Sequence, residues 1–272
     1  MKRTYLACLA LAGALLTTSA TSAGIIEEFK FNESSGVLLG AAVNSANAGN
    51  NWLVHASTVE SAMNGTGAFN IQKNSVLTQA SNALEIANIT SGTAYLVVDI
   101  AGWNYTPTAS TTSERVRFAF LDNDPASTGG STVTAEMNID RLGNALTLRG
   151  EAIGTGATTL LGTQYALPLV QTNPLRLILE LNKDADTYAV HYKDGAGPLT
   201  SLGSGSLGDR SAGVKREGRS IRFAFTGGFG DTGEFFNIDR IFLSTTPIPE
   251  PGTLLLTLVA ATGIAFLRKR SS

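Results

Sequence analysis

Few side chains in this sequence have the type and spacing needed for acid–base or nucleophilic chemistry. Its 272 residues include two histidines, His55 and His191, and one cysteine, Cys8. Neither histidine has a partner at a metal-ligand spacing. The sequence has no Gly-x-Ser-x-Gly nucleophile elbow and no phosphate-binding glycine loop. These observations argue against serine hydrolase chemistry and against nucleotide binding.

Carboxylates are the remaining catalytic candidates, because glycoside hydrolysis needs two of them about 5 to 10 Å apart. The Glu-x-Asp-x-x-Glu arrangement of sandwich glucanases is absent. Glu27, Glu28 and Glu33 form the densest glutamate cluster near a predicted strand, and we interpret them as solvated charge. We therefore predict that the protein is not an enzyme and keep a glycan-active enzyme as a third hypothesis.

Oxygen ligands suited to a hard cation occur in two predicted loops. Asp122 and Asp124 flank Asn123, and a second group of alternating oxygen ligands spans residues 182–186. Neither loop completes an EF-hand, which needs a glycine at its sixth position and a glutamate at its twelfth. Asn and Asp also favour turns on backbone grounds alone. We expect no obligatory cofactor and retain a structural calcium at Asp122 and Asp124 as a hypothesis.

Aromatic side chains are the candidates for sugar recognition. Trp103 and Tyr105 are two residues apart and share one face of a predicted strand. Exposed, they would form a stacking platform for a glycan. The alternative is a place in the hydrophobic core, which is the commoner position of aromatic residues on strands.

Alternating hydrophobicity predicts that strands position all these residues. Leu175, Leu177, Leu179 and Leu181 share one strand face by their period of two. Ten segments have strand character: 25–31, 83–89, 94–103, 114–120, 131–139, 145–153, 174–182, 187–192, 220–225 and 234–243. Turn-forming clusters separate them, and the glycine-rich GSGSLGD at 203–209 is one of the predicted turns. We predict an all-β, two-layer antiparallel sandwich of the jelly-roll, concanavalin-like kind.

Two four-residue motifs each occur twice in the sequence. Arg-Phe-Ala-Phe stands at 117–120 and at 222–225, and Asn-Ile-Asp-Arg at 138–141 and at 237–240. One explanation is that half of the domain is duplicated. The other is that similar strands within one sandwich have similar surroundings, and we favour this second explanation because the residues between the motifs differ. Within each Asn-Ile-Asp-Arg segment, alternation predicts that the neighbouring Asp and Arg lie on opposite faces of the strand.

The N-terminus has the features of an export signal. Lys2 and Arg3 precede an apolar run over residues 6–16, and small residues at 21–23 offer a cleavage site. The signal removes two of the 20 basic residues; the last 26 residues remove three basic and one of the 22 acidic residues. The remaining body, 24–246, thus has 15 basic against 21 acidic residues, a net charge of −6. This charge disfavours nucleic acid as a partner.

The C-terminus has three ordered parts. Pro249-Glu250-Pro251 precedes an uncharged run at 252–267, which ends in Arg268, Lys269 and Arg270. As a helix the run measures about 24 Å, short of a hydrocarbon layer of about 30 Å. The basic residues after it would remain in the cytoplasm and leave the body outside. We predict a transmembrane-type helix at 252–267, flanking the sandwich as the signal helix 1–23 does at the other end.

These parts together resemble the PEP-CTERM sorting signal of Gram-negative bacteria. The resemblance covers residues 247–272 and implies recognition of Pro249, Glu250 and Pro251 by an exosortase, a membrane protease. It also implies an envelope, cell-surface or extracellular-matrix location, often linked to exopolysaccharide production. The body more weakly resembles concanavalin-like and laminin-G-like sandwiches, through its paired alternating runs at 175–194 joined by an Asp/Asn turn. Such domains bind glycans or proteins and sometimes calcium.

The sequence therefore predicts an exported protein in three parts: a signal peptide at 1–23, a sandwich ectodomain at 24–246 and a sorting signal at 247–272. Its expected partners are the export machinery, an exosortase-type protease and polysaccharide. The expected body is a non-catalytic structural or adhesive domain. The alternative is a lectin-like carbohydrate-binding module.

Overall fold

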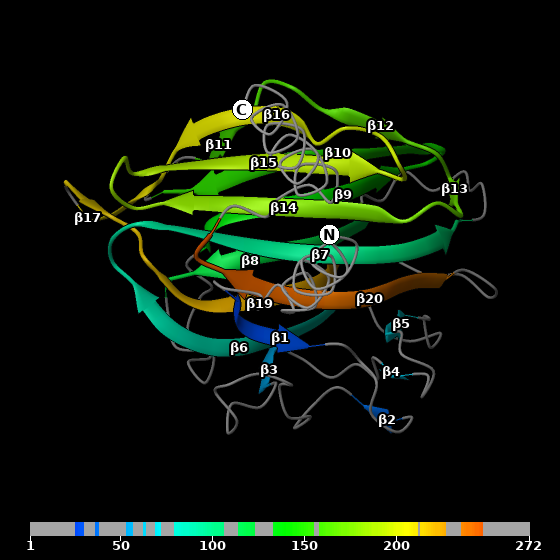
Figure 1. The fold of residues 1–272 in the computed structure, drawn as a ribbon, viewed down its shortest axis with the longest axis horizontal. Coiled ribbons are helices and arrows are strands. Elements are labelled where there is room, and N and C mark those ends of the chain that lie inside the picture. The colour runs from blue at the N-terminus through cyan, green and yellow to red at the C-terminus, as the bar shows by residue number, and fades with distance from the viewer. Residues whose placement is uncertain are drawn as a thin grey trace, which may run out of the picture.

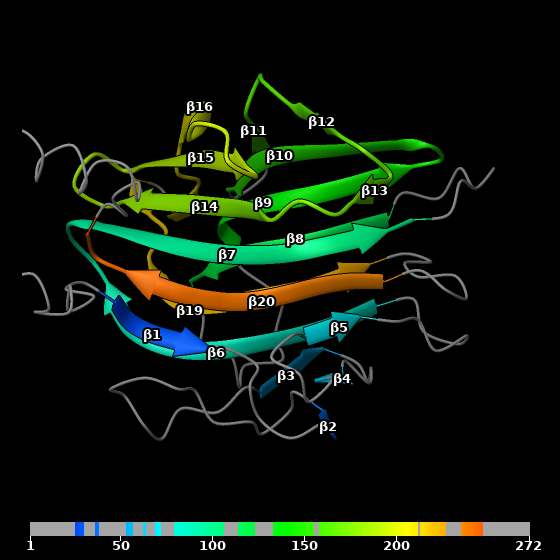
Figure 2. The same cartoon turned by 45° about the vertical axis from the view of Figure 1, so that its right-hand side comes forward.

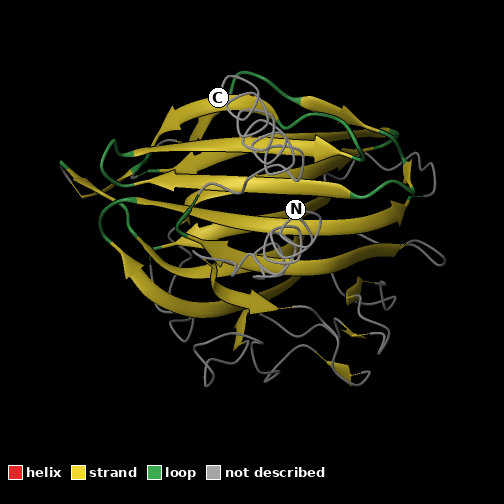
Figure 3. Cartoon of the chain, viewed as in Figure 1, coloured by secondary structure: helices red, strands yellow, loops and turns green. Residues whose placement is uncertain are grey.

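The computed structural model describes residues 25–29, 36–37, 53–56, 62–63, 69–71, 79–105, 114–122, 133–154, 158–211, 213–226 and 235–246. Throughout these ranges the regular structure is strand, drawn yellow in Figure 3. None of the described segments forms a helix long and apolar enough to cross a membrane.

The strands form two large sheets that lie face to face (Figure 1). Sheet 1 has the order β16-β15-β14-β7-β20-β5-β4-β2, with β1 paired to β20 and β13 to β7. Its strands are β16 (Thr200–Ser206), β15 (Thr187–Asp194), β14 (Leu175–Asn182), β7 (Thr93–Asn104), β20 (Phe235–Ser244), β5 (Phe69–Ile71), β4 (Ala62–Met63), β2 (Gly36–Val37), β1 (Ile25–Phe29) and β13 (Val170–Gln171). Every pairing in it is antiparallel.

Sheet 2 lies behind sheet 1 in Figure 1 and has the order β11-β10-β9-β8-β19-β6-β3, with β12 paired to β10. Its strands are β11 (Thr158–Leu160), β10 (Ala145–Ile153), β9 (Val133–Leu142), β8 (Glu114–Leu121), β19 (Gly218–Thr226), β6 (Gln79–Ile89), β3 (Leu53–Ala56) and β12 (Tyr165–Leu167). A small ribbon of β17 (Asp209–Ser211) and β18 (Val214–Lys215) stands apart from both sheets. The turned view in Figure 2 shows the same two layers, with β7 and β20 in one and β8 and β19 in the other.

The core lies between the inner faces of the two sheets. Leu96, Val98 and Ile100 of β7 point inward from sheet 1, and Met137 and Ile139 of β9 point inward from sheet 2. All five side chains are at most 1% exposed. Burial of a large apolar side chain of this kind contributes about 1.5 to 3 kcal/mol. The apolar residues at alternate positions therefore hold the two sheets together by packing against each other.

The predicted all-β antiparallel sandwich is confirmed, and each of the ten predicted segments contains a strand. The predicted signal helix and C-terminal helix lie outside the described residues. One turn prediction is wrong, because Gly203 and Gly205 belong to edge strand β16 rather than to a turn. Gly205 is needed there because an added Cβ would lie 2.7 Å from Tyr188 Cε1 on the neighbouring β15. A bulge in the same pairing gives Gly203 a positive φ of 115°.

The two repeated motifs differ in how their copies are distributed between the sheets. Both Arg-Phe-Ala-Phe segments lie in sheet 2 on adjacent strands, with Phe118 of β8 opposite Phe223 of β19. The two Asn-Ile-Asp-Arg segments lie in different sheets, on β9 and on β20. Duplication of half of the domain would give both motifs the same relationship between their copies, so this arrangement favours similar local surroundings over duplication.

Candidate functional site

A layer of charged and amide side chains covers the outer face of four adjacent strands in sheet 2. On β8, β9, β10 and β19 one set of alternate residues points into the core, so the other set points outward. We call this set the charged lattice. Its members are Arg115, Arg117, Glu136, Asn138, Asp140, Arg149, Glu151 and Arg222.

Ion pairs between neighbouring strands connect the lattice. Asp140 lies between Arg115 Nε at 3.2 Å and Arg149 Nε at 2.7 Å. Glu136 lies 3.8 Å from Arg117 Nη1 and 3.4 Å from Arg222 Nη2. Glu136 is fully buried, so these arginines supply the opposite charge that a buried carboxylate requires.

Glu136 and Glu151 are direct cross-strand partners on β9 and β10. A hydrogen bond joins their side chains, and it requires a proton on one of the two carboxyl groups. Burial raises the pKa of Glu136 to about 7, and the bond with Glu151 acts in the same direction. Burial works to raise the pKa of Glu151, but the bond with Glu136 and the charge of Arg149 and other arginines lower it. Burial and the neighbouring Glu151 thus both favour the protonated form of Glu136.

Several buried polar atoms of the lattice have no hydrogen-bond partner within the described ranges. They are Arg117 Nε, Asn138 Oδ1, Asp140 Oδ1, Arg149 Nε and Arg222 Nε. Asn138 is fully buried, and its Nδ2 donates to Glu136 Oε1 at 3.1 Å. An unpaired buried polar atom costs about 1 to 3 kcal/mol, so these atoms lower the net stability that the lattice contributes.

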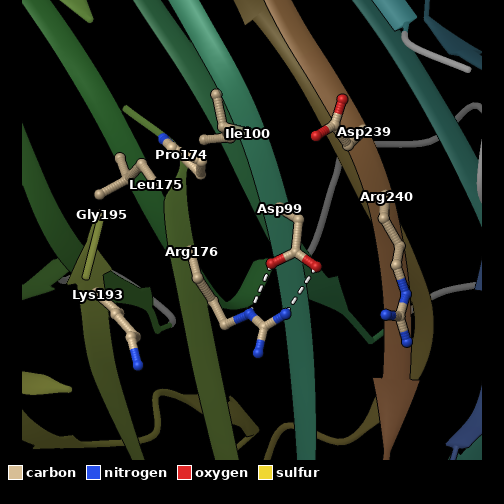
Figure 4. Close-up of a pocket in the computed structure, with 9 residues that line it drawn as sticks. All are labelled: Asp99, Ile100, Pro174, Leu175, Arg176, Lys193, Gly195, Asp239 and Arg240. Carbon is tan, nitrogen blue, oxygen red and sulfur yellow. Dashed lines mark hydrogen bonds and ion pairs between the residues drawn. The ribbon is translucent and has the colours of Figure 1, made fainter. Parts of the chain in front are cut away.

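A second feature is a groove of 490 Å³ on sheet 1. Figure 4 shows its lining residues: Asp99, Ile100, Pro174, Leu175, Arg176, Lys193, Gly195, Asp239 and Arg240. Arg176 and Asp99 form a two-pronged pair, in which Nε and Nη2 donate to the two carboxylate oxygens at 2.6 and 2.9 Å. Volumes of about 300 to 1,000 Å³ are typical of small-ligand sites.

A bulge in β20 shapes one side of this groove. Ile238 pairs with Ile100 and Arg240 with Asp99, so Asp239 is an extra residue without a partner on β7. Asp239 and Arg240 consequently both line the groove. The prediction that these neighbours lie on opposite faces is wrong for β20, because the bulge resets the alternation. It holds on regular β9, where Asp140 joins the lattice and Arg141 is buried below the Tyr105 ring.

Sequence comparisons give no family: no family model matches the chain, and no curated protein matches it. Solved structures do match. An endo-1,3-beta-glucanase from Streptomyces sioyaensis is 13% identical with a TM-score of 0.53, covering 83% of this chain and 97% of its own. Lectin II from Ulex europaeus is 10% identical at a TM-score of 0.46, covering 80% of this chain and 97% of its own. The Ca²⁺/Man-bound VIP36 exoplasmic/lumenal domain is 8% identical at a TM-score of 0.49, and the match covers 80% of this chain and 91% of that domain.

The chain shares the sandwich fold of that glucanase. At such low identity the likeness shows the fold alone. It confirms the expected concanavalin-like body. The PEP-CTERM resemblance stays a prediction, since Pro249, Glu250, Pro251, Arg268, Lys269 and Arg270 lie outside the described residues.

Trp103 and Tyr105 lie in the core, at 0% and 1% exposure. Trp103 stacks on Phe236 with ring centroids 5.7 Å apart, and its Nε1 donates to the carbonyl of Pro168 at 3.0 Å. Neither ring presents a face to which a sugar has access in this arrangement. The residues do share one strand face, as the alternation predicts, but that face is the inner one.

Asp122 is 4% exposed, between Arg210 Nε at 3.4 Å and Arg219 Nε at 3.6 Å. Two cations beside one carboxylate disfavour a calcium ion there. Asp124 lies outside the described residues, and the described ranges contain no group of three or more metal-ligating side chains.

The second loop proposed for calcium uses its oxygen atoms for internal contacts. Asp184 Oδ1 accepts from the Gly92 backbone N–H at 2.8 Å, and Asn182 Oδ1 accepts from the Ala185 N–H at 2.9 Å. Lys183 pairs with Asp186 Oδ1 at 2.5 Å. The loop is a tight turn between β14 and β15. The backbone explanation of its Asn and Asp residues is therefore sufficient.

The charged lattice was missed by motif searches because its members lie on four separate strands. A signal was nevertheless present in the sequence. Polar or charged residues occupy alternate positions at 115 and 117, at 134, 136, 138 and 140, and at 147, 149 and 151. The period showed that these residues share strand faces, while the strand order that brings them together required the tertiary structure.

Proposed function

We propose that this protein is an exported, non-catalytic carbohydrate-binding protein whose binding surface is the charged lattice on sheet 2. The observation that carries the proposal is the density of hydrogen-bonding side chains there, among which Arg115, Arg117 and Arg149 are partly exposed. Arg, Asn, Asp and Glu offer planar donors and acceptors that match pairs of neighbouring sugar hydroxyls. The sandwich shared with an endo-1,3-beta-glucanase supports a glycan as the ligand class.

Binding without hydrolysis is favoured by the carboxylate geometry. Glycosidases keep their two carboxyl groups about 5 to 10 Å apart, so that the scissile bond or a water molecule fits between them. Glu136 and Glu151 instead share a hydrogen bond. Asp140 is held between two arginines. In the proposal these carboxyl groups are fixed hydrogen-bonding groups rather than a general acid and a nucleophile placed on either side of a glycosidic bond.

We further propose that the C-terminal signal delivers the protein to the cell surface or extracellular matrix. The order of Pro249-Glu250-Pro251, apolar run and terminal basic residues supports this destination. An exosortase-type protease would act on the signal after export. Polysaccharide at that location would then be the ligand of the sandwich.

The test is a glycan array probed with the full chain in detergent, with and without calcium. Arg117→Gln and Arg149→Gln should each weaken binding about tenfold, because each removes charge-assisted hydrogen bonds. Arg210→Gln is the matched control, an exposed arginine whose partner, Asp122, lies outside the lattice. Thermal unfolding of each variant checks that the fold is intact. If no glycan binds under either calcium condition, the proposal is wrong.

A further inference from the structure

The outer face of sheet 1 carries an apolar cluster across three adjacent strands. Val97 on β7, Ile178 on β14 and Phe242 on β20 form it, and the side chain of Tyr95 packs against it. Val97 is the register partner of both Ile178 and Phe242, so the three side chains lie side by side on one face. Val98, the next residue on β7, points into the core instead. We call Val97, Ile178 and Phe242 the outer cluster.

The outer cluster is buried although it points away from the core. Val97 is 0% exposed, Phe242 is 3% exposed and Ile178 is 4% exposed. The Arg240 guanidinium, 4.0 Å from the centre of the Phe242 ring, covers part of that ring. Among the described strands, none lies across this face, which is turned toward the viewer in Figure 1. An antiparallel sheet commonly has one face in water, so burial this complete indicates that a further segment covers the cluster.

The chain turns onto this face at the end of β20. Ser244, the last residue of β20, is the register partner of Tyr95, so its side chain lies on the outer face. Ser244 Oγ donates to the Thr246 carbonyl at 2.9 Å and accepts from the Thr246 N–H at 3.2 Å. These bonds draw the backbone of Thr246 toward the outer face, where the chain bends at 245–246. The segment after Thr246 therefore starts on the same side of sheet 1 as the outer cluster.

The sequence that follows Thr246 suits an apolar face. Residues 247–251 read Pro-Ile-Pro-Glu-Pro, and Ile248 is the one large aliphatic side chain among them. Proline has no backbone N–H, so an extended segment of this composition leaves few donors without a partner when it lies on apolar side chains. Extended, these residues span about 16 to 18 Å, whereas the two strand spacings from β20 to β14 amount to about 10 Å. The segment is long enough to cross the whole cluster.

We propose that residues 247–251 dock across the outer cluster as a strap, with Ile248 as its apolar anchor. The strap includes the predicted Pro-Glu-Pro sorting motif, so the motif is presented on the folded sandwich rather than on a free linker. With the predicted helix 252–267 in a membrane, the strap turns the outer face of sheet 1 toward the bilayer and the charged lattice away from it. The docking itself rests on strand geometry and is independent of glycan binding.

The first experiment replaces Ile248 by p-benzoylphenylalanine, a photo-cross-linking amino acid, in the full chain in detergent. Mass spectrometry after irradiation identifies the segment that this side chain contacts. The expected product is a cross-link within one chain to the β14 peptide that contains Ile178, because β14 lies two strands away from β20. The same replacement at Ile264, in the apolar run, is the matched control and should not capture β14. A cross-link from position 248 to a second copy, or to no part of sheet 1, would overturn the inference.

Thermal unfolding gives a second readout without a bulky probe. Ile248→Ser should lower the melting temperature by about 2 to 4 °C, because it removes an apolar side chain from the outer cluster. Ile264→Ser should leave the melting temperature unchanged. A loss on deletion of residues 1–23, with none for Ile248→Ser, would assign the cover to the N-terminal segment and overturn the strap. Glycan affinity should be equal in Ile248→Ser and the wild type, so failure of the lattice proposal would leave both strap experiments unaffected.

Discussion

Glu136 and Glu151 lie opposite each other on β9 and β10, joined by a hydrogen bond that needs one shared proton. Four arginines surround this pair: Arg115, Arg117, Arg149 and Arg222. A proton on one of the two carboxyl groups removes the repulsion between two negative charges at this position on the outer face of sheet 2. The arrangement makes the stability of the fold sensitive to pH.

Glu136→Gln should remove part of that pH dependence. The pKa of Glu136 is raised to about 7 from an ordinary value of 4.5, so the native state holds its proton more tightly than the unfolded chain does. The wild type is expected to lose this contribution, on the order of 3 kcal/mol, as pH rises from about 4.5 to about 7. The Gln amide keeps a donor toward Glu151 without titrating. Urea unfolding between pH 5 and pH 8 should therefore give a flatter profile for the variant.

Asp209→Asn is the control for this prediction, because Asp209 forms an exposed pair with Lys215 far from the lattice. The free energy of unfolding of this variant should depend on pH in the same way as that of the wild type. Parallel profiles for Glu136→Gln and the wild type would contradict a shared proton at Glu136.

Gly102→Ala should destabilise the sandwich by about 1 to 3 kcal/mol. An added Cβ would overlap the backbone carbonyl of Gln171, and β13 pairs with β7 at this point. Gly162→Ala is a matched substitution at a site with open space around the new Cβ, and it should change stability by about 0.5 kcal/mol or less. Thermal unfolding of both variants makes the comparison. Equal losses would mean that β13 does not approach β7 as closely as described.

Trp103→Ala should cost about 3 to 5 kcal/mol, because it leaves a cavity beside Phe236 and removes the donor to Pro168. The milder Trp103→Phe should keep the fold and lower its stability. Glycan affinity of Trp103→Phe should equal that of the wild type. A loss of glycan affinity at unchanged stability would return Trp103 to the role of a binding platform.

Calcium should not stabilise the protein through Asp122. Two arginines already neutralise this buried carboxylate, so a divalent cation would have to displace them. We expect the melting temperatures of the wild type and of Asp122→Asn to respond equally to calcium and to its removal by a chelator. A calcium-dependent rise in the wild type alone would restore the predicted metal site.

Replacing Pro249-Glu250-Pro251 by alanines should leave the sandwich folded and block removal of the C-terminal segment. The unprocessed chain should then accumulate in the membrane fraction of an exosortase-containing bacterium that expresses it. Mass spectrometry of the wild-type protein released from the cell surface gives its C-terminal residue. Recovery of Arg270 in that material would replace the sorting hypothesis with a permanent anchor.

The sequence by itself determined the strands and the faces of their residues. Period two placed Leu177 and Leu179 inside, as well as Trp103 and Tyr105 on one common face. It left open whether that common face was inner or outer, because a strand alone does not define which side meets the second sheet. The opposite sheet decided this by covering Trp103.

The tertiary structure alone decided which strands are neighbours, and the charged lattice and the groove on sheet 1 both depend on that order. Glu136 and Glu151 are close because β9 and β10 pair in one register, and a shift of one residue would turn Glu151 into the core. Asp239 and Arg240 share the groove only because a bulge in β20 interrupts the alternation that the sequence predicts. Pairing register and bulges arise from contacts between distant segments, so local sequence patterns do not specify them.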